Sequence, residues 1–340
     1  MSKETIRQAK SLKPGLIVAA LVGLAFLPHL FELVDLRYGE SFWQNAMIFI
    51  LMYVAMGQAW NVLGGYAGQL SFGHAAFFGI GAYTSTVLLI ETGLTPWVGM
   101  LLGAIAAVLV SLAVGYPTFV LRGHYFALAT LALGQVALIS FNRWDLVNAA
   151  RGLYLPLEHL NQPEYMMWSP DNKLPYYYVI LGIAALSVLT VAVIDRSRLG
   201  LYLKAINQDE DGAANLGLDV RHYKLIAMGI SAFFTALVGS FFAQYVQYID
   251  PYVVMPLRIS VLIVVVALLG GRGSVWGPLL GAAFVILFSE ISRAQLGGRG
   301  EGLDFILFGL VIMLLAVYEP RGLVALLERF RRRLAWRSWR

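Results

Sequence analysis

Residues that could carry out chemistry are few in this sequence, and they do not gather at a catalytic spacing. No cysteine is present, which excludes disulfides, thiolate metal sites and cysteine nucleophiles. No Gly-x-x-x-x-Gly-Lys-Ser/Thr loop is present either, so the chain has no means of cradling ATP phosphates. The histidines fall in different segments without metal-ligand spacing: His29, His74, His124, His159 and His222. The sequence therefore predicts a chain that is not an enzyme and that holds no cofactor of its own.

A glycine-rich stretch, residues 64–83 (GGYAGQLSFGHAAFFGIGAY), brings hydrogen-bonding side chains into an otherwise apolar part of the chain. Irregular backbone at membrane depth survives only where it is buried in protein or lines a wet cavity. We expect Ser71 to cap the helix that follows, which leaves the first free amides, near Gly73, His74 and Ala75, with partial positive charge. Alternatively, the glycines allow close helix packing and His74 bonds to a neighbouring helix.

A second stretch, residues 270–284 (GGRGSVWGPLLGAAF), resembles the first in composition and also opens with a glycine pair. Because glycine permits backbone changes that other residues resist, one hinge is predicted in each half of the chain. The predicted hinge residues are Gly64, Gly65, Gly68, Gly270, Gly271 and Gly273. The alternatives are that such connections are simply common in membrane proteins, and that glycines spaced four apart serve helix packing.

The composition places both stretches in a membrane. Hydrophobic residues make up 59% of the 340 residues, charged residues only 13%, and the mean hydropathy is +0.70, which lies outside the range of soluble domains. No polar stretch is long enough for a separate domain, so residues 1–340 are predicted to form one all-α, polytopic membrane domain. Apolar runs predict about ten spans, near residues 15–31, 43–62, 74–90, 97–120, 124–141, 176–194, 225–247, 257–270, 278–296 and 303–318.

The distribution of charge predicts the orientation of these spans. With a cytoplasmic amino terminus, eighteen lysines and arginines lie inside and seven outside, as the positive-inside rule requires. Both termini are therefore predicted to be cytoplasmic, with a basic arm at residues 1–14. Residues 319–340 are predicted to form a basic amphipathic helix on an anionic leaflet, or else a solvated basic tail. The apolar core of the span at 257–270 is short, so a broken helix is expected there.

The largest connection on the predicted cytoplasmic side is residues 196–224, which mixes charge with a short helix-forming core. An acidic run at 209–211 favours a helix start, and small apolar residues follow before Gly217 can end the helix. Such a helix fits a groove on a partner protein, and a solvated connecting helix is the alternative. The residues predicted to meet the partner are Asp209, Glu210, Ala213, Ala214, Leu216 and Gly217.

Three blocks of the sequence resemble the LivM-type permeases of bacterial branched-chain amino acid importers. AINQDEDGAANLGLDVRHYKLIAMGISAF is similar to the cytoplasmic coupling segment of ATP-binding-cassette importer permeases, WNVLGGYAGQLSFGHAAFFGIGAY to the signature region of the LivM type, and LLGGRGSVWGPLLGA to its third block. The blocks occur in the family's order, and the resemblance spans roughly residues 40–320. One departure is Asn207, where the family usually carries a basic residue.

The resemblance implies a multi-pass permease subunit of the bacterial inner membrane that works by alternating access. Its implied partners are two ATP-binding subunits, which use ATP and magnesium, a second LivH-like permease subunit and a soluble substrate-binding protein; no nucleic acid is expected. The coupling segment would dock on the ATPase. The translocation path is expected at Gln69, Ser71, Gly73, His74 and Gln135.

Two alternatives to this function remain open at the level of sequence. Urea or short amides are alternative substrates, because the family includes such permeases. An ion-coupled transporter working alone is a second alternative, although it should show acidic residues at mid-membrane. The acidic residues of this chain cluster at the predicted ends of spans, among them Glu290, which is expected to be exposed or paired with Arg293.

Overall fold

The computed structural model describes residues 39–155 and 173–296, together with Gly23, Gly309, Leu310, Met313 and residues 322–326. In chain order the elements are α3 (Glu40–Trp60), the π-helix η1 (Asn61–Tyr66), α4 (His74–Thr92), α5 (Pro96–Thr118), α6 (His124–Arg143), the 3-10 turns η2 (Asp145–Val147) and η3 (Ala149–Arg151), β1 (Leu153–Tyr154), α7 (Lys173–Arg196), α8 (Arg198–Gln208), α9 (Glu210–Asn215), α10 (Val220–Val246), β2 (Tyr248–Ile249), α11 (Pro251–Val254), α12 (Leu257–Gly270) and α13 (Gly277–Leu296).

Eight helical segments among the described residues are long and apolar enough to cross a membrane. They correspond to eight of the expected spans, which confirms an all-α polytopic fold apart from two very short strands. The expected spans at 15–31 and 303–318 fall almost wholly outside the described residues, as do the arm at 1–14 and most of the tail at 319–340. The orientation of the termini stays a prediction.

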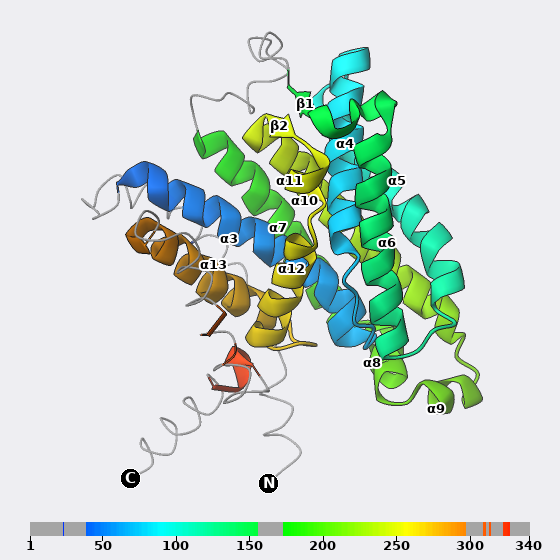
Figure 1. Ribbon diagram of the computed structural model, residues 1–340. Coiled ribbons are helices and arrows are strands. Elements are labelled where there is room, and N and C mark those ends of the chain that lie inside the picture. The colour runs from blue at the N-terminus through cyan, green and yellow to red at the C-terminus, as the bar shows by residue number, and fades with distance from the viewer. Residues whose placement is uncertain are drawn as a thin grey trace, which may run out of the picture.

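Two groups of helices build the described part of the molecule (Figure 1). α4, α5 and α10 pack against one another, while α3 packs against α7 and α13, and α12 packs against both α13 and α3. α10 also contacts α3 and thereby joins the two groups. In Figure 1, α3 and α13 run obliquely on the left, whereas α4 and α6 stand upright on the right.

Glycines allow α4 and α10 to cross at backbone contact. A Cβ atom at Gly81 would overlap the carbonyl oxygen of Ala236, and one at Gly239 would overlap that of Phe78. Such close approach is the usual role of small residues between membrane helices. The packing interpretation is confirmed for Gly81, and it also holds for Gly281, which faces the backbone of α12.

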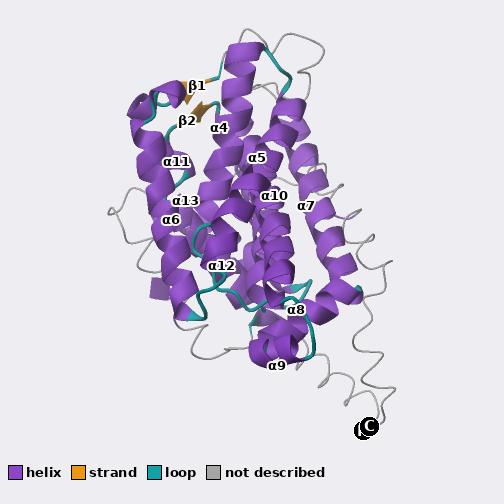
Figure 2. Ribbon diagram, turned by 90° about the vertical axis from the view of Figure 1, so that its right-hand side faces the viewer, coloured by secondary structure: helices purple, strands orange, loops and turns teal. Residues whose placement is uncertain are grey.

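One span ends in a π-helix, and another is interrupted. α3 continues into η1, and the chain then runs as an irregular loop, residues 67–73, to the start of α4 about midway along the bundle (Figures 1 and 2). The segment Pro251–Gly270 is broken at Met255 and Pro256, where α11 ends and α12 begins. Proline disfavours the helical conformation in the residue before it and has no amide to donate. The broken helix expected at 257–270 is therefore confirmed.

The two ends of the bundle carry different structures (Figure 2). α8 and α9 lie at one end, called the α9 end below, and β1 and β2 lie at the other, the β1 end. The two strands pair antiparallel, with Leu153 opposite Ile249, and so tie the loop after α6 to the turn between α10 and α11. Gly322, at the start of residues 322–326, packs on Gly271 after α12.

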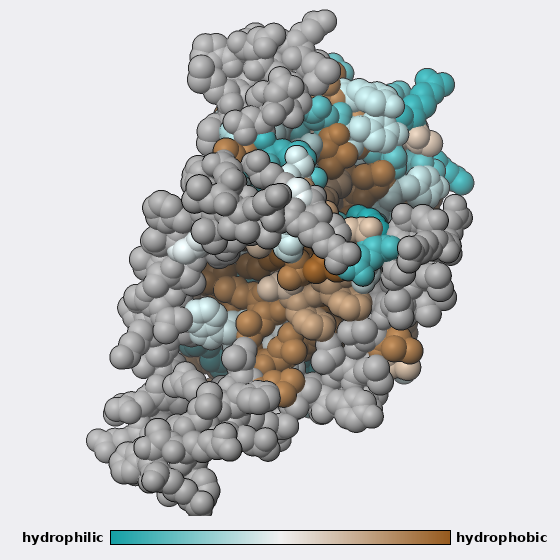
Figure 3. Space-filling model, turned by 90° about the vertical axis from the view of Figure 1, so that its left-hand side faces the viewer, coloured by the Kyte–Doolittle hydropathy of each residue, from teal (hydrophilic) through white to brown (hydrophobic). Residues whose placement is uncertain are grey.

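Large apolar side chains remain exposed on the outside of the bundle. On α5 and α6, Leu109 and Leu128 are 62% and 63% exposed. Figure 3 shows the side on which α3 and α13 lie, where apolar side chains gather in a hollowed patch in the middle of the described surface. Surfaces of this kind are unfavourable in water and suit hydrocarbon.

Candidate functional site

The loop before α4 is held by local hydrogen bonds. Trp60 Nε1 donates to the Ser71 carbonyl oxygen (2.9 Å), so the end of α3 anchors the loop. α4 begins at His74, and its N-cap residue is Gly73. The expectation that Ser71 caps α4 is therefore wrong. The Ser71 hydroxyl accepts the Gly73 amide (3.3 Å) and stabilises the loop, not the first helical turn.

The first turn of α4 is bound by hydroxyl groups from three other helices. His74 Nε2 lies 2.7 Å from Ser231 Oγ of α10, and the Ala75 amide donates to Ser260 Oγ of α12 (2.8 Å). Thr130 Oγ1 of α6 accepts an amide of the preceding loop (3.1 Å). Of the three amides expected to be free, those of Gly73 and Ala75 therefore have hydroxyl partners within the chain.

Two buried polar atoms in the loop before α4 and in its first turn have no hydrogen-bond partner among the described residues. His74 Nδ1 and Gln69 Oε1 are buried atoms with no hydrogen-bond partner there, and His74 is 0% and Gln69 7% exposed. Buried polar atoms nearly always have partners. These two atoms therefore retain hydrogen-bonding capacity that the described part of the chain does not use.

The fifth residue of the predicted path lies on a different helix. Gln135 is partly exposed on α6, next to Gly134, and a Cβ atom at Gly134 would lie 3.7 Å from Gly73 Cα. The five predicted residues are thus distributed over the loop, the first turn of α4 and the adjoining face of α6. Ser231, Ser260 and Thr130 were missed, because isolated hydroxyls in apolar helices carry no signal of their own in the sequence.

The two predicted hinges lie against each other. Asn61 of η1 donates from Nδ2 to the Ser274 carbonyl oxygen (3.0 Å) and accepts the Gly273 amide at Oδ1 (2.7 Å). Gln58 Nε2 donates to the Val275 carbonyl oxygen (2.6 Å). Both amide side chains are fully buried. Sequence reasoning missed them, and they join the helical turns just before the first glycine-rich stretch to the second stretch.

The predicted hinge glycines are required sterically at this contact. A Cβ atom at Gly65 would lie 2.5 Å from the Gly273 amide nitrogen, so the two backbones meet directly. Gly68 has a φ of +72°, which L side chains rarely adopt. Of the remaining predicted positions, Gly64 lies within η1, and Gly270 and Gly271 lie at the end of α12. Movement at these positions stays a prediction.

The predicted partner-binding segment forms two helices, α8 and α9. Asp209 is the N-cap residue of α9, and its Oδ1 accepts the Gly212 amide (3.0 Å), which confirms the expected helix start. Gly217 follows the helix with a φ of +86°, and the Leu218 amide donates to the Ala213 carbonyl oxygen (3.2 Å). This is the Schellman arrangement in which glycine ends a helix, so the expected end is confirmed as well.

A small apolar patch is exposed at the C-terminal end of α9, beside the exposed polar residues Asp211 and Asn215. Leu216 is 84% exposed, and Ala214 and Gly217 are exposed beside it. Ala213 is only 3% exposed and packs into the chain, so it supports the helix from beneath. Of the residues predicted to meet a partner, Asp209, Ala214, Leu216 and Gly217 are therefore exposed, and Glu210 is partly exposed.

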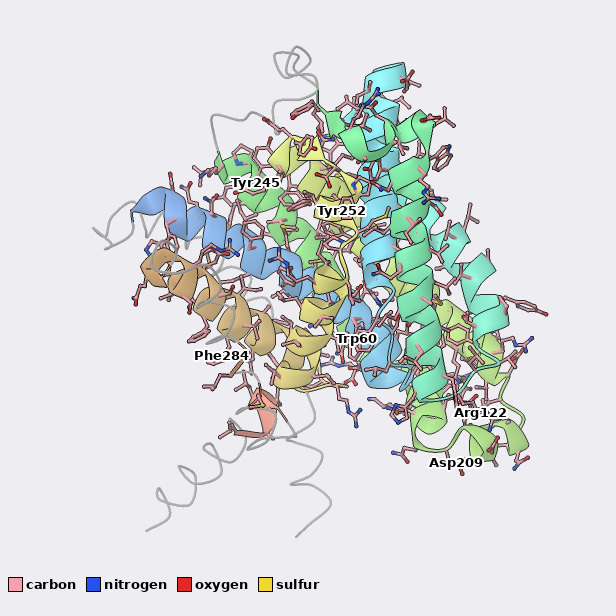
Figure 4. All side chains as sticks on the ribbon, viewed as in Figure 1. Trp60, Arg122, Asp209, Tyr245, Tyr252 and Phe284 are labelled. Carbon is pink, nitrogen blue, oxygen red and sulfur yellow. The ribbon has the colours of Figure 1, made fainter. Side chains whose placement is uncertain are left out.

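A charged cluster that the sequence analysis did not single out holds α9 in place. Lys224 of α10 has a fully buried side chain, and its Nζ lies 2.7 Å from Glu210 Oε2. Arg122, in the loop between α5 and α6, lies 2.9 Å from Asp211 Oδ1. Figure 4 shows Arg122 close to Asp209 at this end of the bundle. Lys224 was missed because its place at the edge of an apolar run indicates only the end of a span.

Ionisable groups also occur within the other spans. Glu290 and Arg293 form an ion pair at 3.4 Å on α13, which confirms the expectation that they are paired. Arg258 is exposed on α12, inside the span Pro251–Gly270, and was not singled out by the sequence analysis. Among the described residues, no group of three or more histidines and carboxylates could hold a metal ion.

Known proteins share this sequence pattern over most of the chain. The family model for the permease component of branched-chain amino acid transport systems matches residues 43–316. The chain is 26% identical over 294 residues to the high-affinity branched-chain amino acid transport system permease protein LivM of Escherichia coli strain K12, covering 81% of this chain and 68% of that protein.

Two further relatives broaden the comparison. The chain is 24% identical over 286 residues to the permease protein LivH of Salmonella typhimurium, covering 80% of this chain and 91% of that protein. It is 23% identical over 267 residues to the nucleoside ABC transporter permease protein NupC of Lactococcus lactis subsp. cremoris, covering 74% and 81%. No solved structure matched the chain.

The matched residues include the interrupted span Pro251–Gly270, the loop before α4, the contact between the two glycine-rich stretches and the pair α8 and α9. The resemblance stated from the sequence blocks is therefore confirmed over most of the chain. The chain is a multi-pass membrane protein without catalytic activity of its own, and it belongs to the family of permease components of branched-chain amino acid ATP-binding-cassette transport systems.

Proposed function

We propose that this chain is the LivM-like permease subunit of an importer that carries branched-chain or other apolar amino acids into a bacterial cell. The observation that carries the proposal is the family match over residues 43–316, which takes in the polar loop at the start of α4 together with the exposed helix α9. A second, LivH-like permease would complete the translocation path. A soluble binding protein would deliver the substrate.

Energy for transport has to come from other polypeptides. The sequence holds no phosphate-binding loop, so two ATP-binding subunits would use ATP and magnesium on its behalf. Their contact would be the exposed surface of α9, made by Ala214, Leu216 and Gly217. Movement received there would open the path to one side of the membrane and then to the other, by alternating access.

The glycine contact between η1 and the end of α12 is the proposed element that changes between these states. π-Helical turns are often found at functional sites, and here one is joined to the second glycine-rich stretch through Asn61. Coupling between distant sites requires an element with two arrangements. The start of α4 lies one loop away and would follow any change in η1.

The start of α4 would offer polar partners to the amino acid as it passes. Replacing His74 with alanine, or Ser231 with alanine, is expected to lower uptake about tenfold, because losing the partner of a buried polar group costs about 1–3 kcal/mol. Uptake of labelled leucine into vesicles that contain the assembled importer measures this. Ser187→Ala is the matched control, since Ser187 is a buried serine whose hydroxyl bonds only to Ala184 of its own helix. An unchanged rate and substrate preference in both variants would remove these residues from the path.

The substrate is tested by competition in the same vesicles. We expect leucine to be accumulated in preference to uridine and urea. A nucleoside is the second candidate, because NupC, the nucleoside ABC transporter permease, is similar to this chain at nearly the same identity as LivH. Accumulation of uridine or urea without leucine would show that the proposed substrate class is wrong while leaving the permease function in place.

A further inference from the structure

The coupling segment, residues 198–217, is attached to both groups of helices, and its two helices make different polar contacts. α8 continues from α7 and contacts both η1 and α10, whereas α9 leads into α10 and contacts α10 but none of α3, α7 or η1 closely. α7 belongs with α3 and α13, and α10 belongs with α4 and α5.

α8 is fastened to α7 and η1 by a polar cluster. Asp195, near the end of α7, accepts hydrogen bonds at Oδ1 from Lys204 Nζ (2.6 Å) and from the Tyr66 hydroxyl (3.0 Å). Lys204 Nζ also lies 5.1 Å from the centre of the Tyr66 ring. Asn207, the position that departs from the family pattern, donates from Nδ2 to the Gly65 carbonyl oxygen (3.0 Å). The end of α8 is thus bonded to the glycine pair of η1.

α9 is fastened to α10 and to the loop between α5 and α6. Glu210 is the partner of Lys224, whose side chain is fully buried. A buried charge left without its partner is strongly unfavourable, so this pair holds α9 firmly against α10. Arg122 adds an exposed pair with Asp211 and lies 3.9 Å from Glu210 Oε1. Exposed pairs contribute little alone, and the Arg122 contacts mainly orient the loop on α9.

A single residue separates the two helices. Asp209 has extended backbone, with φ −154° and ψ 107°. Its amide donates to the Ala205 carbonyl oxygen at the end of α8 (3.1 Å), and its carboxylate accepts the Gly212 amide in α9. The angle between α8 and α9 is therefore set by the backbone of one residue.

We propose that the coupling segment is a two-part lever, in which Asn207 positions α8 on η1, the Glu210–Lys224 pair positions α9 on α10, and Asp209 is the joint. The proposal rests on the proposed docking of an ATPase on α9. Pressure on the exposed face of α9 would move α10, α4 and α5 relative to α8, η1 and α3. One arm of the lever, α8, ends at η1 and so connects the ATPase to the glycine contact. The other arm, α9, is fixed to α10, on which the start of α4 packs.

The absence of cysteine from the sequence allows the lever to be observed directly. Spin labels on cysteines at Val120, in the loop between α5 and α6, and at Leu201, on α8, occupy exposed positions. In the complex with its ATPase subunits, the distance between them is expected to change between the nucleotide-free and the ATP-trapped states. A second pair, Leu201 with Val193 on α7, tests the other arm and is expected to keep its distance.

The outcomes separate the lever from the function on which it rests. A change in the first pair alone supports the lever. If both distances change, or if neither distance changes, in a complex that hydrolyses ATP, the lever is overturned and the proposed function still stands. Failure of ATPase subunits to co-purify with the unsubstituted chain overturns both.

The positioning role of the buried pair has its own readout, the amount of substrate taken up per ATP hydrolysed. Glu210→Gln is expected to lower this ratio about tenfold, within the usual range of coupling between sites, while ATPase subunits still bind through Leu216. The exchanged pair, Glu210→Lys with Lys224→Glu, is expected to restore it. A ratio that stays unchanged in Glu210→Gln, with normal amounts of assembled complex, would show that the pair does not position α9.

Discussion

Replacing Leu216 with glutamate is expected to abolish ATP-dependent uptake and the assembly of the ATPase with this chain. Leu216 is 84% exposed in the chain alone, so the change leaves folding and membrane insertion intact. Burial of a leucine at an interface contributes about 1.5–3 kcal/mol, and a carboxylate buried in its place without a partner costs several more. Affinity for the ATPase should fall at least about a hundredfold, since each 1.4 kcal/mol is a factor of about ten.

Co-purification of the ATPase subunits and uptake in vesicles measure this effect. Leu146→Glu is the matched control, because Leu146 is 77% exposed and lies in the turn η2 after α6, at the β1 end. That variant should keep the ATPase in the complex. Normal uptake and normal subunit stoichiometry in the Leu216 variant would place the docking surface somewhere other than α9.

Replacing Gly239 with alanine is expected to prevent stable folding, the second large effect. The added Cβ would overlap the carbonyl oxygen of Phe78, and backbone atoms have no rotamer through which to move aside. α4 and α10 would have to separate along the crossing that joins them. Forcing extra atoms into a packed core destabilises a protein by about 1–3 kcal/mol where side chains can adjust. Because backbone atoms cannot adjust in this way, we expect the loss of stability here to reach or exceed the upper end of that range.

The thermal stability and the yield of detergent-purified protein measure the loss. Gly229→Ala, on the same helix, is the matched control, because its Cβ would meet only Val108 Cγ1 at an ordinary 3.7 Å. Alanine is favoured over glycine inside a helix by about 1 kcal/mol, so this variant should be as stable as the unsubstituted chain or slightly more so. Equal stability of the two variants would contradict the close crossing of α4 and α10.

Features that depend on neighbours along the chain could be predicted from the sequence. Apolar runs placed the eight described spans, the short apolar core at 257–270 indicated a broken helix, and Asp209 and Gly217 marked the two ends of α9. These signals work because caps and proline act within one or two turns of helix, and hydrophobic length acts within a single continuous segment. The glycine-rich stretches were recognised for the same reason, although their meeting was not.

What the sequence could not supply is the choice of partners across long separations. Asn61 bonds to Gly273, 212 positions away, His74 to Ser231, 157 away, and Asn207 to Gly65, 142 away. An amide or hydroxyl in an apolar helix has many possible partners, and only the packing of the helices selects one. Ser71 shows the limit even at short range, since its hydroxyl stabilises the loop and Gly73 caps the helix. Local patterns therefore gave the elements and the family, while the tertiary structure decided which polar groups meet, because buried hydrogen bonds form wherever helix packing brings donor and acceptor together.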